Sequence, residues 1–112
     1  VMIKVPGTAE GCIALEQLIA DGLNVNVTLL FAVDAHARVI EAYLSGLERR
    51  AEAGQPLGHV ASVASFFVSR VDTAIDARLD ALAKAGTISA ERARSLQGRA
   101  AIANAQRAYR LF

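Results

Sequence analysis

The sequence has little of several residue types that mark particular protein classes. A single cysteine, Cys12, among 112 residues excludes an internal disulfide framework and a cysteine-based metal cluster. Lys and Arg number 12 against 11 Asp and Glu, and this net charge of +1 gives no electrostatic reason to expect a nucleic-acid or membrane partner. The low cysteine content fits a reducing compartment, so the cytoplasm is the default expectation.

Long apolar segments are also missing. The longest apolar run, around residues 27–33, is far short of the roughly 20 residues that a membrane-spanning helix needs. No secretory signal is recognisable, and neither is a glycine-rich phosphate loop or a dinucleotide fingerprint. The chain opens at Val1, directly in what is predicted as a buried strand, so we expect it to be an excised piece of a longer protein.

What is present suits one α/β domain, or part of one. With 54% hydrophobic and 21% charged residues the chain can bury a core. Apolar spacing and turn signals predict strands at residues 1–5, 24–30 and 59–65. They also predict four helices: one from the Thr8 cap to 21–22, one from Asp34 to the charged run Glu48–Glu52, one that ends at Gly86, and one from the Ser89 cap to about Tyr109. Alternating strands and helices imply parallel strands.

The second strand favours a closed barrel over an open doubly wound sheet. Asn24, Asn26 and Thr28 share one face of it, whereas a central strand of a doubly wound sheet is apolar on both faces. A polar face that points into a barrel, near its catalytic end, explains the alternation. We therefore predict three βα units plus an extra helix from a TIM (β/α)8 barrel, an incomplete barrel because a full one takes roughly 250 residues.

Lys4 is the candidate nucleophile. Lys4 interrupts an apolar strand that ends at Pro6-Gly7, with only Val5 between the lysine and this turn, so we expect Lys4 at the carboxyl end of the strand. Ile3 and Val5 are expected to face the helices. A lysine amine that apolar walls desolvate loses its preference for the charged form and can attack a carbonyl to form a Schiff base. The alternative is an edge-strand lysine that discourages aggregation.

Further candidates follow the later strands. Asn26, Thr28 and Ser65 carry the amide and hydroxyl groups that could bind a polyol, although such residues at strand ends often satisfy loop backbone groups instead. Arg70, where a helix begins, could bind a phosphate, or it could form a surface ion pair with Asp72 or Asp76.

Other polar residues are predicted to be structural. His36 lies within an amphipathic helix, and His59 precedes a strand at the end away from the chemistry. Cys12 is expected to be a small core residue. The charged residues Glu48, Arg49, Arg50 and Glu52 are interpreted as a solvated helix end.

Three motifs in this order resemble the central barrel strands of transaldolase: MIKVPGT at 2–8, GLNVNVTLLF at 22–31 and VASVASFFVSRVD at 60–72. The tail GRAAIANAQRAYRLF resembles the following helix of the longer bacterial forms. The resemblance covers essentially the whole chain. The Pro-Gly-Thr after the lysine resembles the branch with actinobacterial and cyanobacterial enzymes. It implies that residues 1–112 are the central fragment of a class I aldolase-type barrel, about strands 4 to 6 with their helices.

The resemblance also implies roles. Lys4 matches the Schiff-base lysine, Asn26 and Thr28 match residues that bind substrate hydroxyls and a catalytic water, Ser65 a substrate-contacting hydroxyl, Phe67 an aromatic wall, and Arg70 a phosphate-binding arginine. The family moves a dihydroxyacetone unit from a ketose phosphate, such as sedoheptulose 7-phosphate, to glyceraldehyde 3-phosphate in the pentose phosphate pathway, without a cofactor. Sugar phosphates are thus the expected partners, with no nucleic acid or membrane.

Part of that machinery has no match here. The family takes its acid-base glutamate and a lysine-partnering aspartate from earlier strands, and a second phosphate-binding arginine from after the sixth strand. We therefore expect the isolated chain to be inactive or poorly folded. Two alternatives stay open: a lysine-dependent aldolase that does not transfer, and a non-enzymatic flavodoxin-like binding domain, which the lack of acidic residues at the strand ends disfavours.

Overall fold

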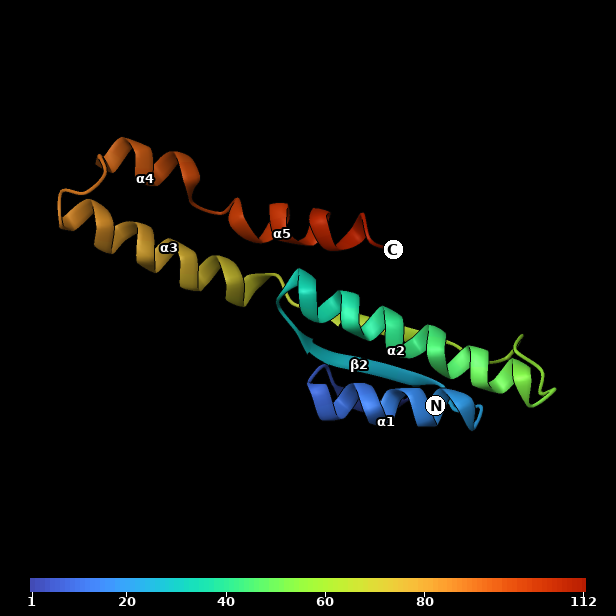
Figure 1. Cartoon of the computed structure of the whole chain (residues 1–112). Helices are drawn as coiled ribbons and strands as arrows, with labels where there is room; N and C mark the ends of the chain where they lie inside the picture. The colour runs from blue at the N-terminus through green and yellow to red at the C-terminus, as the bar shows by residue number, and fades with distance from the viewer. The chain divides into compact units, whose positions relative to one another are not determined.

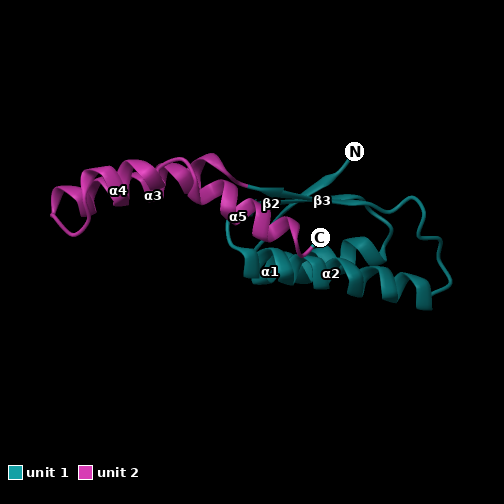
Figure 2. Ribbon diagram, turned by 90° about the horizontal axis from the view of Figure 1, so that it is seen from above, with its two compact units in different colours: residues 1–66, 112 teal, residues 67–111 magenta.

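A computed structural model describes all residues, 1–112, and the chain divides into two compact units. The first comprises residues 1–66 with Phe112, and the second comprises residues 67–111 (Figure 2). Each unit is described by itself.

The first unit is a parallel sheet with its helices on one face. Its elements are β1 (Ile3–Pro6), α1 (Ala9–Ala20), β2 (Val25–Leu30), α2 (Val33–Glu52) and β3 (Ser62–Phe66). The strands are parallel and lie in the order β1-β2-β3, and both α1 and α2 cover the same face (Figure 2). The predicted α/β class and the predicted parallel strands are confirmed. A doubly wound sheet would instead carry helices on both faces.

The apolar residues of the strands meet the helices. Val5, Val25 and Val27 are buried on the helix-covered face of the sheet. They pack with Leu15 and Ile19 of α1 and with further buried residues of α2 and β2, including Val39 and Leu30. Cys12 is partly buried against this core, as predicted. The period-two pattern of β2 therefore determines which face of the sheet meets the helices and which stays polar.

Helix α1 begins and ends where the sequence predicts. The hydroxyl of Thr8, the N-cap residue, accepts a hydrogen bond from the Gly11 amide at 3.1 Å. At the other end, Gly22 adopts φ 86°, a backbone conformation that favours glycine. Helices α1 and α2 approach closely at Gly46, where a Cβ would lie 2.7 Å from Ile19 Cβ. A side chain at Gly46 would push the two helices apart.

The end of α2 differs from the prediction. Arg50 is not solvated but buried, with 7% of its surface exposed. Its Nε donates to the Pro56 carbonyl at 2.8 Å and its Nη1 to the Ala20 carbonyl at 3.1 Å. Arg49 forms an ion pair with Glu16 at 3.0 Å. The prediction of a solvated helix end was wrong for Arg50, because it binds carbonyls of α1 and of the loop before β3, which are distant in sequence. Glu48, Arg49 and Glu52 are exposed, as predicted.

Strand β2 carries one extra residue near its end. Val27 pairs with Ala64 and Leu30 pairs with Phe66, so three steps along β2 match two steps along β3. Leu29 lies in this bulge with φ 61°, the left-handed region that costs a leucine about 1–2 kcal/mol. The bulge turns Leu30 into the core, where it is fully buried next to Gly7.

Three helices make up the second unit: α3 (Ser69–Lys84), α4 (Ala90–Leu96) and α5 (Ala100–Tyr109) (Figure 1). The prediction of one continuous last helix from Ser89 was wrong, because the chain breaks at Gly98, which has φ 68°. Two carboxylates of α3 satisfy the freed amides. Asp76 accepts from the Gly98 amide at 3.1 Å, and Asp72 accepts from the Ala101 amide at 2.8 Å.

The third strand begins later than predicted, at Ser62 rather than His59, because the chain turns before it and the Val60 amide donates to the Leu57 carbonyl at 3.0 Å.

None of the helices has both the length and the apolar character that a membrane crossing requires.

Candidate active site

The polar face of the sheet, opposite α1 and α2, gathers four of the predicted site residues. Lys4 pairs in register with Asn26, Pro6 pairs with Thr28, and Ser65 follows on β3. Residues paired in a parallel sheet project to the same side, so Lys4, Asn26, Thr28 and Ser65 share this polar face. Lys4 and Ser65, 61 positions apart in sequence, thereby lie on one face of the sheet. Lys4 and Asn26 are each the second residue of their strands, so the prediction that Lys4 lies at the carboxyl end of its strand is wrong.

Lys4 is exposed, and it forms no hydrogen bond or ion pair. Val5 is buried beneath the sheet as predicted, but Ile3, expected to face the helices, is 41% exposed. The apolar walls that were expected to desolvate the lysine are not supplied by the first unit, whose helices both lie on the other face (Figure 2). The amine thus has no partner within the chain.

Asn26 and Ser65 form a hydrogen-bonded pair across neighbouring strands. The Ser65 hydroxyl donates to Asn26 Oδ1 at 2.8 Å, and both side chains are half-buried. This bond uses the carbonyl of the Asn26 amide and orients its two N–H donors, which bind no protein acceptor. A hydroxylated ligand on Lys4 would meet those donors directly across the register.

The turn after Lys4 is held in place by the same strand. The Gly7 amide donates to the Thr28 carbonyl at 2.8 Å, which ties the end of β1 to β2. The Thr28 hydroxyl itself has no protein partner. Just beyond the turn, Glu10 lies in the first turn of α1, and hydrogen bonds from its own backbone amide and from the Thr8 side chain hold its pKa below the ordinary glutamate value.

Phe67 and Arg70 belong to the second unit. The Arg70 guanidinium lies over the Phe67 ring, 5.3 Å from its centroid, in a cation–π contact. The alternative of an ion pair with Asp72 or Asp76 is wrong, because those carboxylates accept from the backbone amides of Ala101 and Gly98. The exposed guanidinium therefore keeps its donors for another ligand.

The two histidines lie away from the predicted site residues. His36 is buried at 7% exposure and packs edge-on against Phe66, with ring centroids 5.9 Å apart. Its Nδ1 has no hydrogen-bond partner. His59 lies 3.5 Å from a guanidinium nitrogen of the buried Arg50. His36 is thus packed in the first unit, whereas His59 is exposed. No group of three His, Cys, Asp or Glu side chains could hold a metal ion.

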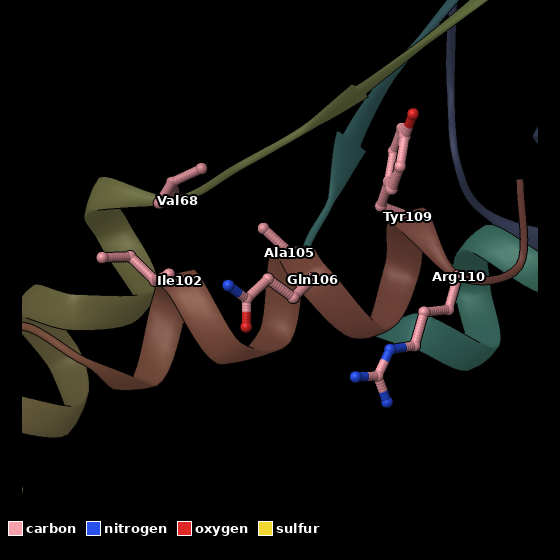
Figure 3. Close-up of a pocket in the computed structure, with 6 residues that line it drawn as sticks. All are labelled: Val68, Ile102, Ala105, Gln106, Tyr109 and Arg110. Carbon is pink, nitrogen blue, oxygen red and sulfur yellow. The ribbon is translucent and has the colours of Figure 1, made fainter.

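A groove in the second unit is separate from the predicted residues. Side chains of α5 and the start of α3 line it, namely Val68, Ile102, Ala105, Gln106, Tyr109 and Arg110 (Figure 3). Its lining is mostly apolar and holds no nucleophile or acid-base pair. Leu29, which no motif singled out, lies in the β2 bulge next to the predicted residue Thr28. The only signal for it was the Leu29-Leu30 pair, which breaks the alternation of β2.

Comparison with known proteins shows which family the chain is similar to. The family model described as "Transaldolase/Fructose-6-phosphate aldolase" matches residues 1–112. A transaldolase of Mycobacterium leprae (strain Br4923) is 50% identical over 110 residues, 98% of this chain and 28% of the relative. The Mycolicibacterium smegmatis transaldolase is 50% identical over 111 residues, which are 99% of this chain and 28% of the relative. Transaldolase 2 of Nostoc sp. (strain PCC 7120) is 50% identical over 115 aligned positions, which cover 100% of this chain and 30% of the relative.

The chain therefore spans less than a third of the length of these relatives, whereas the matches cover 98% to 100% of the chain. The resemblance stated from the motifs is confirmed. With a family model matched over its whole length and relatives at 50% identity, this chain belongs to the transaldolase/fructose-6-phosphate aldolase family.

Proposed function

We propose that this chain is the central part, about strands 4 to 6, of a transaldolase (β/α)8 barrel, in which Lys4 forms the Schiff base. One observation carries the proposal: an unpaired lysine lies in register with the hydrogen-bonded Asn26–Ser65 pair on the polar face of the sheet. Barrel enzymes place their chemistry toward the carboxyl ends of the strands, and Thr28 and Ser65 lie in the second halves of β2 and β3. The position of both helices on one face supports the barrel over a flavodoxin-like sheet.

The chemistry begins with the Lys4 amine. In its neutral form it attacks the ketose carbonyl, and the carbinolamine loses water to give an iminium ion. A base removes the proton of the C4 hydroxyl, the bond between C3 and C4 breaks, and its electron pair moves into the iminium to form an enamine. The aldehyde product leaves, and the three-carbon unit stays on Lys4 until an acceptor aldehyde takes it.

The neighbouring residues bind and orient the substrate. The free N–H groups of Asn26 are directed by Ser65 toward substrate oxygens, and the unpartnered Thr28 hydroxyl can hold a hydroxyl or a water. Phe67 would form a wall of the site, and Arg70 would bind the terminal phosphate through charge-assisted hydrogen bonds. The general base is a carboxylate that this chain does not provide. Sugar phosphates are thus the proposed substrates, and the cytoplasm is the proposed location.

A lysine-dependent aldolase that releases the three-carbon unit is the second candidate. The description of the matching family includes fructose-6-phosphate aldolase, so this activity is the one to separate experimentally. Both candidates share the Schiff-base step. They differ in whether the enamine waits for an aldehyde acceptor or takes a proton and is hydrolysed.

Borohydride trapping on the whole protein tests the shared step. The chain has two lysines, Lys4 and Lys84, so reduction in the presence of fructose 6-phosphate should add a three-carbon or six-carbon adduct to the peptide with Lys4 only. Lys4→Arg should abolish the adduct and the activity, whereas Lys84→Arg, at an exposed position near the end of α3, should leave both unchanged. An unmodified Lys4 peptide in a folded protein would refute the proposal.

A further inference from the structure

The β2 bulge changes which side chains face the substrate. Val27 and Leu30 are both buried on the helix-covered face, although they are three residues apart and a regular strand would put them on opposite faces. The extra residue absorbs the difference, so Thr28 and Leu29 both lie opposite Ser65. Leu29 therefore follows Thr28 on the polar face of the sheet, between the buried residues Val27 and Leu30.

Burial does not explain the conformation of Leu29. Its side chain is 50% exposed, and its backbone holds φ 61°, which a leucine rarely adopts. The backbone conformation is instead maintained on either side of it, by the full burial of Leu30 and by the hydrogen bond from Gly7 to the Thr28 carbonyl. A half-exposed apolar residue is thus held in the bulge, next to Thr28 and opposite Ser65.

Leu29 lies within reach of a group bound to Lys4. With Lys4 in register with Asn26, strand spacing and rise place the Leu29 backbone roughly 10 Å from that of Lys4, across one strand and further along it. An extended lysine that carries a three-carbon unit spans such a separation.

We propose that Leu29 determines whether the three-carbon unit is transferred or released, an inference that rests on the Schiff-base function of Lys4. In release, the enamine carbon takes a proton from water, water adds to the resulting iminium, and dihydroxyacetone leaves as the Lys4 amine re-forms, with one water consumed. In transfer, the same carbon forms a bond to the carbonyl carbon of the acceptor aldehyde. The carbonyl oxygen takes up the electron pair of the C=O π bond and a proton to become a hydroxyl group, and water then hydrolyses the iminium to free the ketose. Leu29 keeps water from the enamine carbon and so disfavours release.

The test replaces Leu29 in the whole protein by a polar residue of similar size that tolerates the left-handed conformation. Leu29→Asn should raise the dihydroxyacetone released per donor cleaved, relative to transfer product, about tenfold. Leu29→Met, which keeps an apolar side chain at this position, should leave the ratio within about twofold of the original. Leu44→Asn is the matched control, because Leu44 is 46% exposed on α2 and lies on the opposite side of the sheet.

Borohydride trapping of each variant with fructose 6-phosphate separates this inference from the proposed function. If Lys4 is trapped in every variant and the release ratio of Leu29→Asn stays unchanged, the role of Leu29 is refuted while the Schiff base stands. If Lys4 is not trapped in the original protein, the proposed function fails, and the role of Leu29 fails with it. A rise in the ratio for Leu44→Asn as large as for Leu29→Asn would also overturn the inference.

Discussion

Arg70 illustrates how the partners of neighbouring side chains decide what a residue can bind. Asp72 and Asp76 lie close to it in sequence, yet both accept hydrogen bonds from backbone amides at the break between α4 and α5. The Arg70 guanidinium stacks on Phe67 instead, which orients it without using its N–H donors. This arrangement suits an arginine that binds an anion from outside the chain.

Arg70→Gln should raise KM for phosphorylated substrates about ten- to a hundredfold, because a hydrogen bond between charged groups contributes about 1.5–3 kcal/mol. Steady-state kinetics of the whole protein check this, with Arg78→Gln as the control, since Arg78 is exposed on the same helix. Substrates without the phosphate should be nearly unaffected by either change. An equal loss for phosphorylated and unphosphorylated substrates would contradict the assignment.

Helix ends carry the polar contacts that hold the secondary-structure elements together. Arg50, near the end of α2, joins the last carbonyl of α1 to the loop before β3. Because the Arg50 side chain is buried and donates to two backbone carbonyls, replacing it removes both hydrogen bonds and leaves a shorter group in a buried position.

Arg50→Lys should destabilise the whole protein by about 2–4 kcal/mol, because a lysine has a single terminal nitrogen and cannot reach both carbonyls in the same geometry. Denaturant unfolding measures this effect. Arg38→Lys, at an exposed position of the same helix, should change stability by less than about 0.5 kcal/mol. Equal effects of the two substitutions would show that the buried contacts of Arg50 are unimportant.

The first turn of α1 predicts a pH dependence. The pKa of Glu10 is lower in the folded chain than its ordinary value, first because of the hydrogen bond with its own backbone amide and then because of Thr8. A lowered folded pKa means that Glu10 stabilises the fold fully above the unfolded value of about 4.3, and that this contribution disappears as the pH falls through the folded pKa.

Thermal midpoints of the original protein and of Glu10→Gln should therefore differ at neutral pH and converge in acid. Glu41→Gln is the control, since Glu41 is exposed in the middle of α2, where no helix N-terminus favours its charge. A difference for Glu10→Gln that stayed constant into acid would contradict the capping interpretation.

At the scale of the whole molecule, the 112 residues carry the proposed nucleophile, Lys4, on an open face of the sheet. The polar face of the sheet has Lys4 exposed, and Val63, which pairs with Asn26 on the same face, is 44% exposed. Relatives of the chain are more than three times as long, because it spans 28% of their length. Residues outside this chain would have to supply the walls and the acid-base group.

The isolated 112-residue chain should accordingly show no transaldolase turnover. A coupled assay with a ketose phosphate and an acceptor aldehyde checks this, with the whole protein measured in parallel as the positive control. Turnover by the isolated chain that Lys4→Arg abolishes would show that the missing strands are dispensable.

Much of the fold could be predicted because it depends on residues close in sequence. The period-two pattern of residues 24–30, the Thr8 cap and the glycine after α1 are local signals, and each element they predict is present. The order of strands and helices then implied parallel pairing. This pairing places Lys4 opposite Asn26 and brings Ser65 close enough to bond with it.

By itself, the sequence determined the family, the α/β class and the residues of the polar face, because these follow from local patterns and from motifs in a set order. Only the tertiary structure decided the rest. Leu29 joins the polar face, Arg50 is buried, and Asp72 and Asp76 turn from Arg70 to the amides of the second unit. Each of these outcomes depends on partners distant in sequence, whose positions exist only once the strands and helices have packed.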